Sequence, residues 1–332
     1  MLRRGWVLGC FLLGMCLSHS LGCRFSSNPS PETSNEKASG KKVPLRVIAT
    51  VGMVGDLVRA MGGEQVQVRH LMAAGVDPHL YRPTRDDTLA IRDADAVFYC
   101  GLRLEGKMSD LLTKASVRHS NIAVTDSIPK VHLLHPEGSD HADPHVWMDV
   151  SLWSHASLSV AQALHDLIPD HREAIESRRQ QWEAKLERLD AFGKEVIGSI
   201  PQEKRVLITS HDAFQYFGRR YGIEVAGIQG ISTDSEAGLK RIRELVDRIV
   251  TQKIEAVFVE SSVPQDSVQA LVRGAADRGH TLKIGGPLFS DSMGDDGTFE
   301  GTYEGMMVHN FKTIAEYLGG RIPDGGYRRT DP

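Results

Sequence analysis

The sequence predicts an α/β protein with two lobes, each a four-stranded, mostly parallel sheet with flanking helices, joined by one long backbone helix. Two observations lead to this fold class. From Val43 onward, short β-branched runs alternate with amphipathic stretches, which is the pattern of βα units on parallel sheets. Four such runs precede residue 130 and four follow residue 200. In chain order, the predicted strands are Leu45–Thr50, Val66–Leu71, Ala94–Cys100, Ile122–Thr125, Arg205–Thr209, Glu224–Ile228, Ala256–Glu260 and Thr281–Gly285.

Two helices are predicted between the two groups of strands. Ser151–Leu167 forms the first, and Pro169 separates it from a longer one at His171–Ile200. A long helix in this position is typical of a connector, so we expect a stiff rod between the lobes. Packing of the helix on one lobe alone is the alternative. Apolar residues recur along the longer helix at helical spacing: Ile175, Trp182, Leu186, Leu189 and Val196.

The N-terminus has the pattern of an export signal. Two arginines precede an apolar run at residues 6–17, which is shorter than the roughly 20 residues that a membrane-spanning helix needs. The following Leu21-Gly22-Cys23 is similar to a bacterial lipobox, in which the cysteine is acylated and becomes the new N-terminus. Cleavage without acylation is the alternative. We expect an exported protein, periplasmic or on the outer face of the cytoplasmic membrane, with a lipid anchor on Cys23.

These features divide the chain into six parts. The segment after Cys23 is polar and rich in Ser, Pro and Asn, so it is expected to be a flexible tether. The expected parts are a signal peptide (1–22), the tether (23–42), an N-terminal lobe (43–170), a linking helix (171–200), a C-terminal lobe (201–320) and a tail (321–332).

The composition excludes several classes of protein. With 41% hydrophobic and 25% charged residues, disorder, collagen and coiled coils are excluded. The net charge is −4 and the basic residues are scattered, so nucleic acid is not an expected partner. Only Cys23 and Cys100 follow the signal, which excludes a disulfide framework, and Cys100 is expected to be a buried strand residue. The chain contains fourteen histidines, so whether it has a metal site is the open question.

A repeated tripeptide is the first indication of such a site. Asp77-Pro78-His79 and Asp143-Pro144-His145 each fall in a loop of the N-terminal half. Proline fixes its own backbone angle and restricts the residue before it, so each histidine is held on a stiff turn. A preorganised donor loses less entropy when it binds a metal ion.

Two further residues follow predicted strands of the C-terminal half. His211 comes directly after one strand, and Asp291 lies in the loop after another. Ligands of open α/β sheets bind at the carboxyl ends of the strands. Three imidazoles and one carboxylate suit Zn²⁺, and with a bidentate aspartate they also suit Mn²⁺. The candidate metal ligands are therefore His79, His145, His211 and Asp291.

The remaining histidines have simpler interpretations. Those within predicted strands or helices, or in polar stretches, are expected to be structural or solvated: His70, His119, His155, His165, His171 and His309. A polar loop before His145 holds three more, at positions 132, 135 and 141. We expect this loop to be solvated, with weak recruitment of metal as the alternative. Sequence motifs of common enzyme classes, such as HExxH, GxSxG, GxGxxG and the phosphate loop, are absent.

Six stretches together resemble a known family, the cluster A-I metal-binding solute-binding proteins of ABC importers, and within it the treponemal-type zinc/manganese receptors. The resemblance covers the chain from about Val43 to Leu318 in family order. It implies two α/β lobes joined by a backbone helix, and one transported Zn²⁺ or Mn²⁺ ion held by the same four candidate ligands. The matching stretches are Gly75–Thr84, Gly101–Met108, Asp143–Asp149, Thr209–Phe217, Gly227–Glu236 and Leu288–Ser292.

The resemblance leaves the identity of the metal open. Many manganese-specific relatives have glutamate at the position of His211, whereas dedicated zinc receptors commonly have a long histidine-rich acidic loop before the second ligand. This chain has His211 and a short loop with three histidines, so it departs from both patterns. Zn²⁺ generally binds such ligands more tightly than Mn²⁺ does.

The expected function is therefore that of a receptor rather than an enzyme. It would pass its ion to the transmembrane subunit of an ABC permease with a cytoplasmic ATPase, and we expect it to be a monomer. An extracytoplasmic zinc-dependent hydrolase is the first alternative, with Asp212 and Glu236 as conceivable bases. A catalytic zinc ion keeps a position open for water, whereas four protein ligands can close the shell. A surface adhesin is the second alternative.

Overall fold

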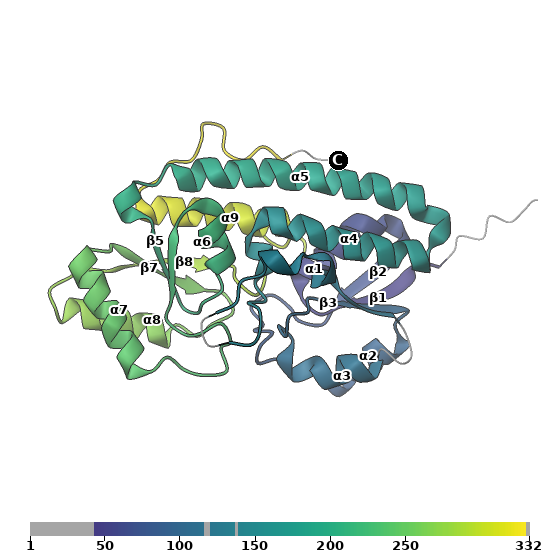
Figure 1. Cartoon of the computed structure of the whole chain (residues 1–332), viewed down its shortest axis with the longest axis horizontal. Helices are drawn as coiled ribbons and strands as arrows, with labels where there is room; N and C mark the ends of the chain where they lie inside the picture. Colours follow the sequence, from purple (N-terminus) through teal and green to yellow (C-terminus); the bar gives the residue numbers. More distant parts are fainter. Residues whose placement is uncertain (1–42, 116–119, 137–138, 330–332) are drawn as a thin grey trace, which may run out of the picture. The chain divides into compact units, whose positions relative to one another are not determined.

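Each half of the chain forms one four-stranded parallel sheet with flanking helices (Figure 1). The structure is a computed structural model that describes residues 43–115, 120–136 and 139–329. The predicted signal peptide (1–22), the tether (23–42) with its Cys23, and the last three residues of the predicted tail lie outside the described residues, as does His119. In the described ranges, no helix combines the length and the hydropathy needed to cross a bilayer.

The two sheets have the same strand order. In each, the first strand of the half lies between the second and the third, giving β2-β1-β3-β4 and β6-β5-β7-β8. Parallel neighbours need crossover connections, which the helices supply. The strands are β1 (Leu45–Ala49), β2 (Val66–His70), β3 (Ala96–Tyr99), β4 (Ser120–Ala123), β5 (Val206–Thr209), β6 (Glu224–Gly227), β7 (Ala256–Glu260) and β8 (Lys283–Leu288).

All eight predicted strands are present. β7 has the predicted bounds, β1, β2, β3, β5 and β6 are shorter than predicted, and β4 and β8 are displaced along the chain. β4 begins and ends two residues earlier than predicted, because Val124–Ser127 is a 3₁₀ turn. β8 continues past Gly286 and Pro287, where the sequence predicts an end. Proline is tolerated there because β8 is an edge strand and its register with β7 is irregular.

The helices cover the sheets and link the halves. Among them, α1 packs on β1 and β2, α9 packs on β8, and α7 packs against α8. Apolar residues on one side of each helix are buried, as the amphipathic patterns predict. The helices are α1 (Gly52–Gly62), α2 (Arg85–Asp93), α3 (Ser109–Ala115), α4 (Val150–Leu167), α5 (Arg172–Gly198), α6 (Gln215–Tyr221), α7 (Leu239–Gln252), α8 (Asp266–Ala276) and α9 (Tyr303–Leu318).

The long helix α5 connects the two halves, as expected (Figure 1). It contacts α1 and α4, which precede it in the chain, and also α6 and α9, which follow it. The predicted apolar stripe of α5 is buried. Trp182 is a packing residue, with its ring 6.2 Å from that of Tyr303 in α9. The alternative in which the helix packs on one lobe alone is therefore wrong.

One apolar core extends through both halves. A single cluster of buried side chains includes Val47 and Phe98 of the first sheet, Leu189 of α5, and Phe258 of the second sheet. A smaller cluster lies between α7, α8 and the second sheet. Cys100 is fully buried beyond the end of β3, and burial raises the pKa of its thiol well above the usual value, as a structural role predicts. This shared core fixes where the carboxyl ends of the strands lie.

Candidate metal centre

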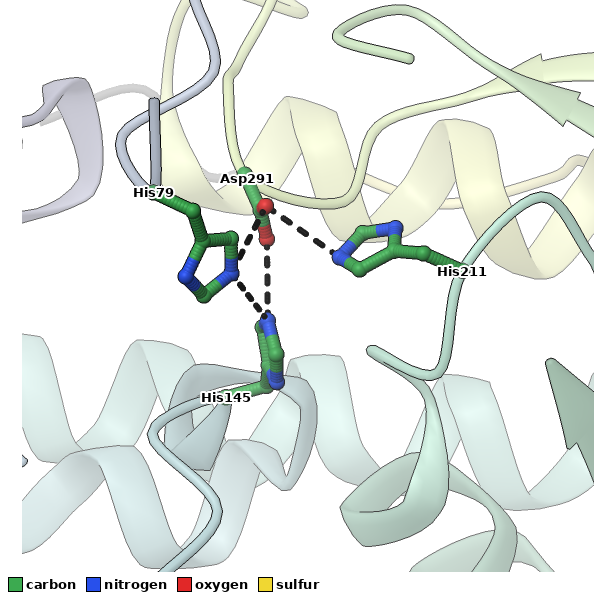
Figure 2. Close-up of side chains that lie close together, drawn as sticks. All are labelled: His79, His145, His211 and Asp291. Atoms are coloured by element: carbon green, nitrogen blue, oxygen red, sulfur yellow. Dashed lines mark hydrogen bonds and ion pairs between the residues drawn. The ribbon is translucent and has the colours of Figure 1, made fainter. Parts of the chain in front are cut away.

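The four candidate ligands come from four loops, each of which follows a different strand. His79 follows β2 and His145 follows β4, while His211 comes two residues after β5 and Asp291 three residues after β8. Each loop therefore leaves the carboxyl end of its strand, where open parallel sheets bind their ligands. The structure brings all four side chains together (Figure 2).

The ligand atoms face one another at short distances. Asp291 Oδ2 lies 3.4 Å from His79 Nε2 and 3.2 Å from His211 Nε2, and Asp291 Oδ1 lies 3.2 Å from His145 Nε2. The two Nε2 atoms of His79 and His145 are 3.3 Å apart. A tetrahedral ion with ligands about 2.0–2.2 Å away separates those ligands by roughly 3.3–3.6 Å. These four distances are close to those around a tetrahedral ion, and all the ligand atoms lie within 4.8 Å of one another.

Burial and hydrogen bonding also fit an ion. All four side chains are buried, His79 being the most exposed at 4%. His211 Nε2 and both carboxylate oxygens of Asp291 are buried without a partner in hydrogen-bond geometry among the described residues. Polar atoms buried without partners cost free energy, which a bound cation would recover. The cluster could therefore hold one divalent ion.

Comparison with known proteins identifies the family. The family described as zinc-uptake complex component A, periplasmic (ZnuA) matches residues 47–317. The chain belongs to this family. It is 45% identical over 274 residues to the manganese-binding lipoprotein MntA of Bacillus subtilis (strain 168), covering 82% of this chain and 90% of that protein. The expected solute-binding family is thereby confirmed.

A treponemal member of the ZnuA family is similar in both sequence and structure. The zinc-binding protein TroA of Treponema pallidum (strain Nichols) is 44% identical over 281 residues, covering 85% of this chain and 90% of that protein. The solved structure of the periplasmic zinc-binding protein TroA superposes with a TM-score of 0.81 at 43% identity, covering 84% of this chain and all of that one. The predicted fold class, two parallel sheets with flanking helices and a connecting helix, is confirmed.

In this ZnuA-family chain, a carboxylate holds the ring of His145. Asp143 Oδ1 accepts hydrogen bonds from the His145 backbone N at 2.9 Å and from its ring Nδ1 at 2.7 Å. The proton therefore sits on Nδ1, and Nε2 is left to face the cluster. Tyr216 of α6 donates to the Asp143 carbonyl at 2.8 Å, which ties this loop to the other half of the chain.

The ring of His211 is held in the same way from within its own half. Glu260, the last residue of β7, accepts from the His211 backbone N at 2.8 Å and from Nδ1 at 2.6 Å. Both side chains are fully buried. Such carboxylate–histidine pairs orient a metal ligand and raise its basicity.

His79 lacks a carboxylate of this kind. Asp77 Oδ1 accepts from the His79 backbone N at 2.8 Å, while its Oδ2 accepts from Thr233 Oγ1 at 2.5 Å. An ion pair between Lys107 Nζ and Asp234 Oδ1, at 2.6 Å, also links the segment around Thr233 to the N-terminal half. His79 lines a pocket of about 380 Å³, whose wall includes Leu102, Arg103, Leu104, His141, Ile231 and Asp234.

The charges of the cluster shift the pKa values of its members. Burial alone would lower the pKa of His145, but Asp291 and Asp143 outweigh it and raise the value to about 9. Burial is likewise outweighed at His211, whose pKa Glu260 and Asp291 raise well above the usual value. The pKa of His79 is instead lowered, chiefly by burial. Asp291 has its pKa held well below the usual value, because His211 and His145 outweigh its burial.

The other histidines lie apart from this cluster. His132, His135 and His141 are exposed, and His141 contacts Arg103. His70 binds Asp296 with Nε2, and His309 bonds the Pro287 carbonyl with its own Nε2, at 2.8 Å. Neither of the conceivable bases belongs to the cluster of four. Asp212 accepts from Gln215 Nε2 at 2.7 Å, and Glu236 is exposed.

Sequence reasoning missed the residues that orient the ligands. Asp143 stands inside the tripeptide that predicts His145, and a buried Glu260 ends an otherwise apolar strand, so both carried a signal. Trp147 was also missed. Its Nε1 donates to the Ser290 carbonyl at 2.9 Å, and its own carbonyl accepts from Tyr303 Oη at 2.6 Å. Trp147 thereby fixes the backbone beside Asp291 relative to the loop of His145.

Proposed function

We propose that this protein is an extracytoplasmic receptor that binds one Zn²⁺ or Mn²⁺ ion per chain and delivers it to an ABC-type permease driven by a cytoplasmic ATPase. The proposed ligands are His79, His145, His211 and Asp291. The observation that carries the proposal is the buried convergence of three Nε2 atoms on one carboxylate, within 4.8 Å of one another. Membership of the ZnuA family supports the role in transport.

The names of the two relatives do not decide between Zn²⁺ and Mn²⁺. One is named for manganese at 45% identity and the other for zinc at 44%. Three imidazoles favour Zn²⁺ in a direct competition, since affinity for such ligands rises from Mn²⁺ to Zn²⁺. Both carboxylate oxygens of Asp291 face the cluster, and a bidentate carboxylate would let a larger ion fit. We propose tighter binding of Zn²⁺, with Mn²⁺ as a second cargo.

We further propose that the bound ion is cargo rather than a catalyst. Four buried protein ligands close a tetrahedral shell, whereas a catalytic zinc ion keeps one position open for water. Asp212 accepts a hydrogen bond from Gln215 Nε2, so its carboxylate is already engaged within its own loop. This favours the receptor over the hydrolase.

The remaining parts of the proposal concern anchoring and assembly. We infer a lipid anchor on Cys23, a tether to residue 42, lobes at 43–170 and 201–320 around the helix at 171–200, and a tail from 321. The lipoprotein relative MntA supports the anchor. A monomer is the simplest form for a receptor that docks on a permease.

The decisive experiment is elemental analysis of the mature chain purified without added metal, followed by competition between Zn²⁺ and Mn²⁺ for the stripped protein. We expect one equivalent of metal, tighter binding of Zn²⁺ and no turnover of esters or peptides. A matched control is His132→Ala, which removes an exposed histidine and should leave the stoichiometry at one. Absence of metal, or measurable hydrolysis by the loaded protein, would contradict the proposal.

The anchor and the oligomeric state are tested separately. Radiolabelled fatty acid should be incorporated into the full chain expressed in bacteria, and Cys23→Ser should abolish the label while Cys16→Ser leaves it. Light scattering of the soluble Cys23→Ser protein should give the mass of one chain. Labelling that persists in Cys23→Ser would place the anchor elsewhere, and a dimer mass would overturn the monomer.

A further inference from the structure

A second polar pocket lies away from the metal cluster. Its walls come from α1, from β2, from the loop at 296–302 and from the C-terminal segment at Arg329, and its volume is about 780 Å³. The helix α1 and the strand β2 pack side by side. None of the four proposed metal ligands lines this pocket. The charged or titratable residues in its wall are Asp56, Arg59, Arg69, His70, Asp296 and Arg329.

The three arginines of the wall, Arg59, Arg69 and Arg329, form no ion pair among the described residues. Arg59 still acts electrostatically on the nearby Asp56, and Arg329 is exposed. The guanidinium of Arg329 instead lies over the ring of Phe299, 4.3 Å from its centroid. Guanidinium groups usually find carboxylates or phosphates as partners. Three guanidinium groups without an ion pair in the wall of one pocket favour an anionic ligand.

His70 adds a further polar group beside Arg59. Its Nδ1 is buried without a hydrogen-bond partner among the described residues, while its Nε2 lies 2.9 Å from Asp296 Oδ2. A methyl group at Gly55 would lie 3.2 Å from His70 Nδ1 and 3.7 Å from Arg59 Nη1, so both atoms approach the same position on α1.

The acidic residues of the wall are already engaged. Asp56 Oδ2 accepts from the backbone N of Tyr303 at 2.9 Å, in the first turn of α9. Asp296 is bound by His70 and has a side chain that is 74% exposed. Arg69 is exposed, and its charge also acts on Tyr81 and Asp87. The three arginines of the wall outnumber its two aspartates, so the wall has a net positive formal charge.

We propose that this pocket binds the phosphate group of a small organic molecule, with Arg59 and Arg329 as its principal ligands. Two planar guanidinium groups match the oxygen geometry and double charge of a phosphate monoester. The volume lies within the range of small-molecule sites and is far larger than a free phosphate needs. Val68 and Phe299 supply apolar surface for the organic part. The phosphate belongs either to a soluble ester or to a lipid headgroup.

The test is a calorimetric titration of the purified, desalted mature chain with glycerol 3-phosphate, at constant ionic strength. We expect saturable binding that Arg59→Gln and Arg329→Gln each weaken at least tenfold. Arg243→Gln, which removes an exposed arginine of α7 outside the pocket, should leave the affinity unchanged. Circular dichroism of each variant shows whether it is folded. Absence of saturable binding, or equal binding by wild type and both pocket variants, would overturn the proposal.

Vesicles distinguish the source of the phosphate. The soluble Cys23→Ser chain is sedimented with phosphatidylglycerol vesicles and, as a control, with phosphatidylcholine vesicles. If the chain binds only the phosphatidylglycerol vesicles, and Arg59→Gln abolishes that binding, the site is assigned to a lipid headgroup. Binding of glycerol 3-phosphate without vesicle binding assigns it to a soluble ester. Both outcomes support a phosphate site. Neither depends on the metal cluster, since Asp291→Asn should leave phosphate binding intact.

Discussion

The loops of His211 and His79 contribute the same chemical group to one cluster, but they hold it differently. His211 is fully buried, and Glu260 binds both its backbone and its ring. Asp77 binds the backbone of His79 but not its ring, and His79 lines a pocket of about 380 Å³. The pKa of His211 is raised and that of His79 is lowered. The comparison teaches that the candidate ligand His211 of the C-terminal half is held by both backbone and ring, whereas His79 of the N-terminal half has no carboxylate on its ring.

The largest effect is expected at Asp291, because its carboxylate faces histidines from both halves of the chain. Asp291→Asn keeps the shape of the side chain but removes the negative charge that faces all three imidazoles. We expect metal affinity to fall by more than the roughly 10–100-fold that outer-sphere changes cause. Isothermal titration with Zn²⁺ measures this. The control Asp295→Asn, at an exposed position of the same loop, should bind normally. Equal affinity of the two variants would remove Asp291 from the site.

The two histidines are then compared directly. His211→Ala removes an imidazole from a fully buried position, so we expect the variant to lose Mn²⁺ entirely. The side chain of His79 lines a pocket, so in His79→Ala we expect water to replace the ring and part of the Mn²⁺ affinity to remain. Proton relaxation of bulk water by bound Mn²⁺ reports such a water, and it should rise in His79→Ala. His132→Ala is the control. Equal loss of Mn²⁺ in both variants would erase the proposed difference between the halves.

Lowering the pH should weaken metal binding, because protons then compete with the metal for His145 and His211. In the metal-free protein the pKa of His145 is about 9 and that of His211 is also raised, so at neutral pH metal must displace a proton from each. His79, with its lowered pKa, contributes none. Affinity should therefore rise with pH toward about 9, and each displaced proton should contribute about tenfold per pH unit. Titrations in buffers of different ionisation enthalpy should count about two protons. A count of zero would contradict these shifts.

A smaller effect is expected from the carboxylate that orients His211. Glu260→Gln keeps a hydrogen-bond acceptor but loses the charge, so we expect a loss of roughly 10–100-fold in Zn²⁺ affinity. Glu203→Gln, at an exposed position, is the matched control. Competition with a chromophoric chelator measures both. If Glu260→Gln binds as tightly as wild type, the fixed character of His211 does not come from this pair.

The smallest effect is expected at the contact that spans the two halves beside His79. Thr233→Val removes the hydroxyl that donates to Asp77, worth about 0.5–1.5 kcal/mol, so we expect metal to dissociate roughly 2–10-fold faster. Stopped-flow transfer of Zn²⁺ to a chelator measures the rate. Ser235→Ala removes a nearby exposed hydroxyl and should leave it unchanged. A rate unaffected by Thr233→Val would show that this contact does not restrain His79.

Much of the fold could be predicted because its signals are local. The β-branched runs give every strand, and the two strands displaced along the chain lie where a 3₁₀ turn and an edge proline act against the local pattern. The four clustered side chains could also be predicted, since strand ends converge at one edge of a sheet. The different roles of Asp77 and Asp143 could not. Both stand in the same tripeptide, but only the fold decides that Asp143 reaches its histidine ring while Asp77 reaches Thr233.

The burial of Cys100 has a practical consequence. Between Val43 and Arg329 it is the one cysteine in the sequence, and its thiol is both inaccessible and kept protonated by its raised pKa. A soluble Cys23→Ser chain is thus a nearly blank background for maleimide chemistry. Two cysteines introduced at exposed sites, such as Lys114 and Lys240, would carry a donor and an acceptor dye on opposite halves. Single molecules could then be watched as the cargo enters and leaves.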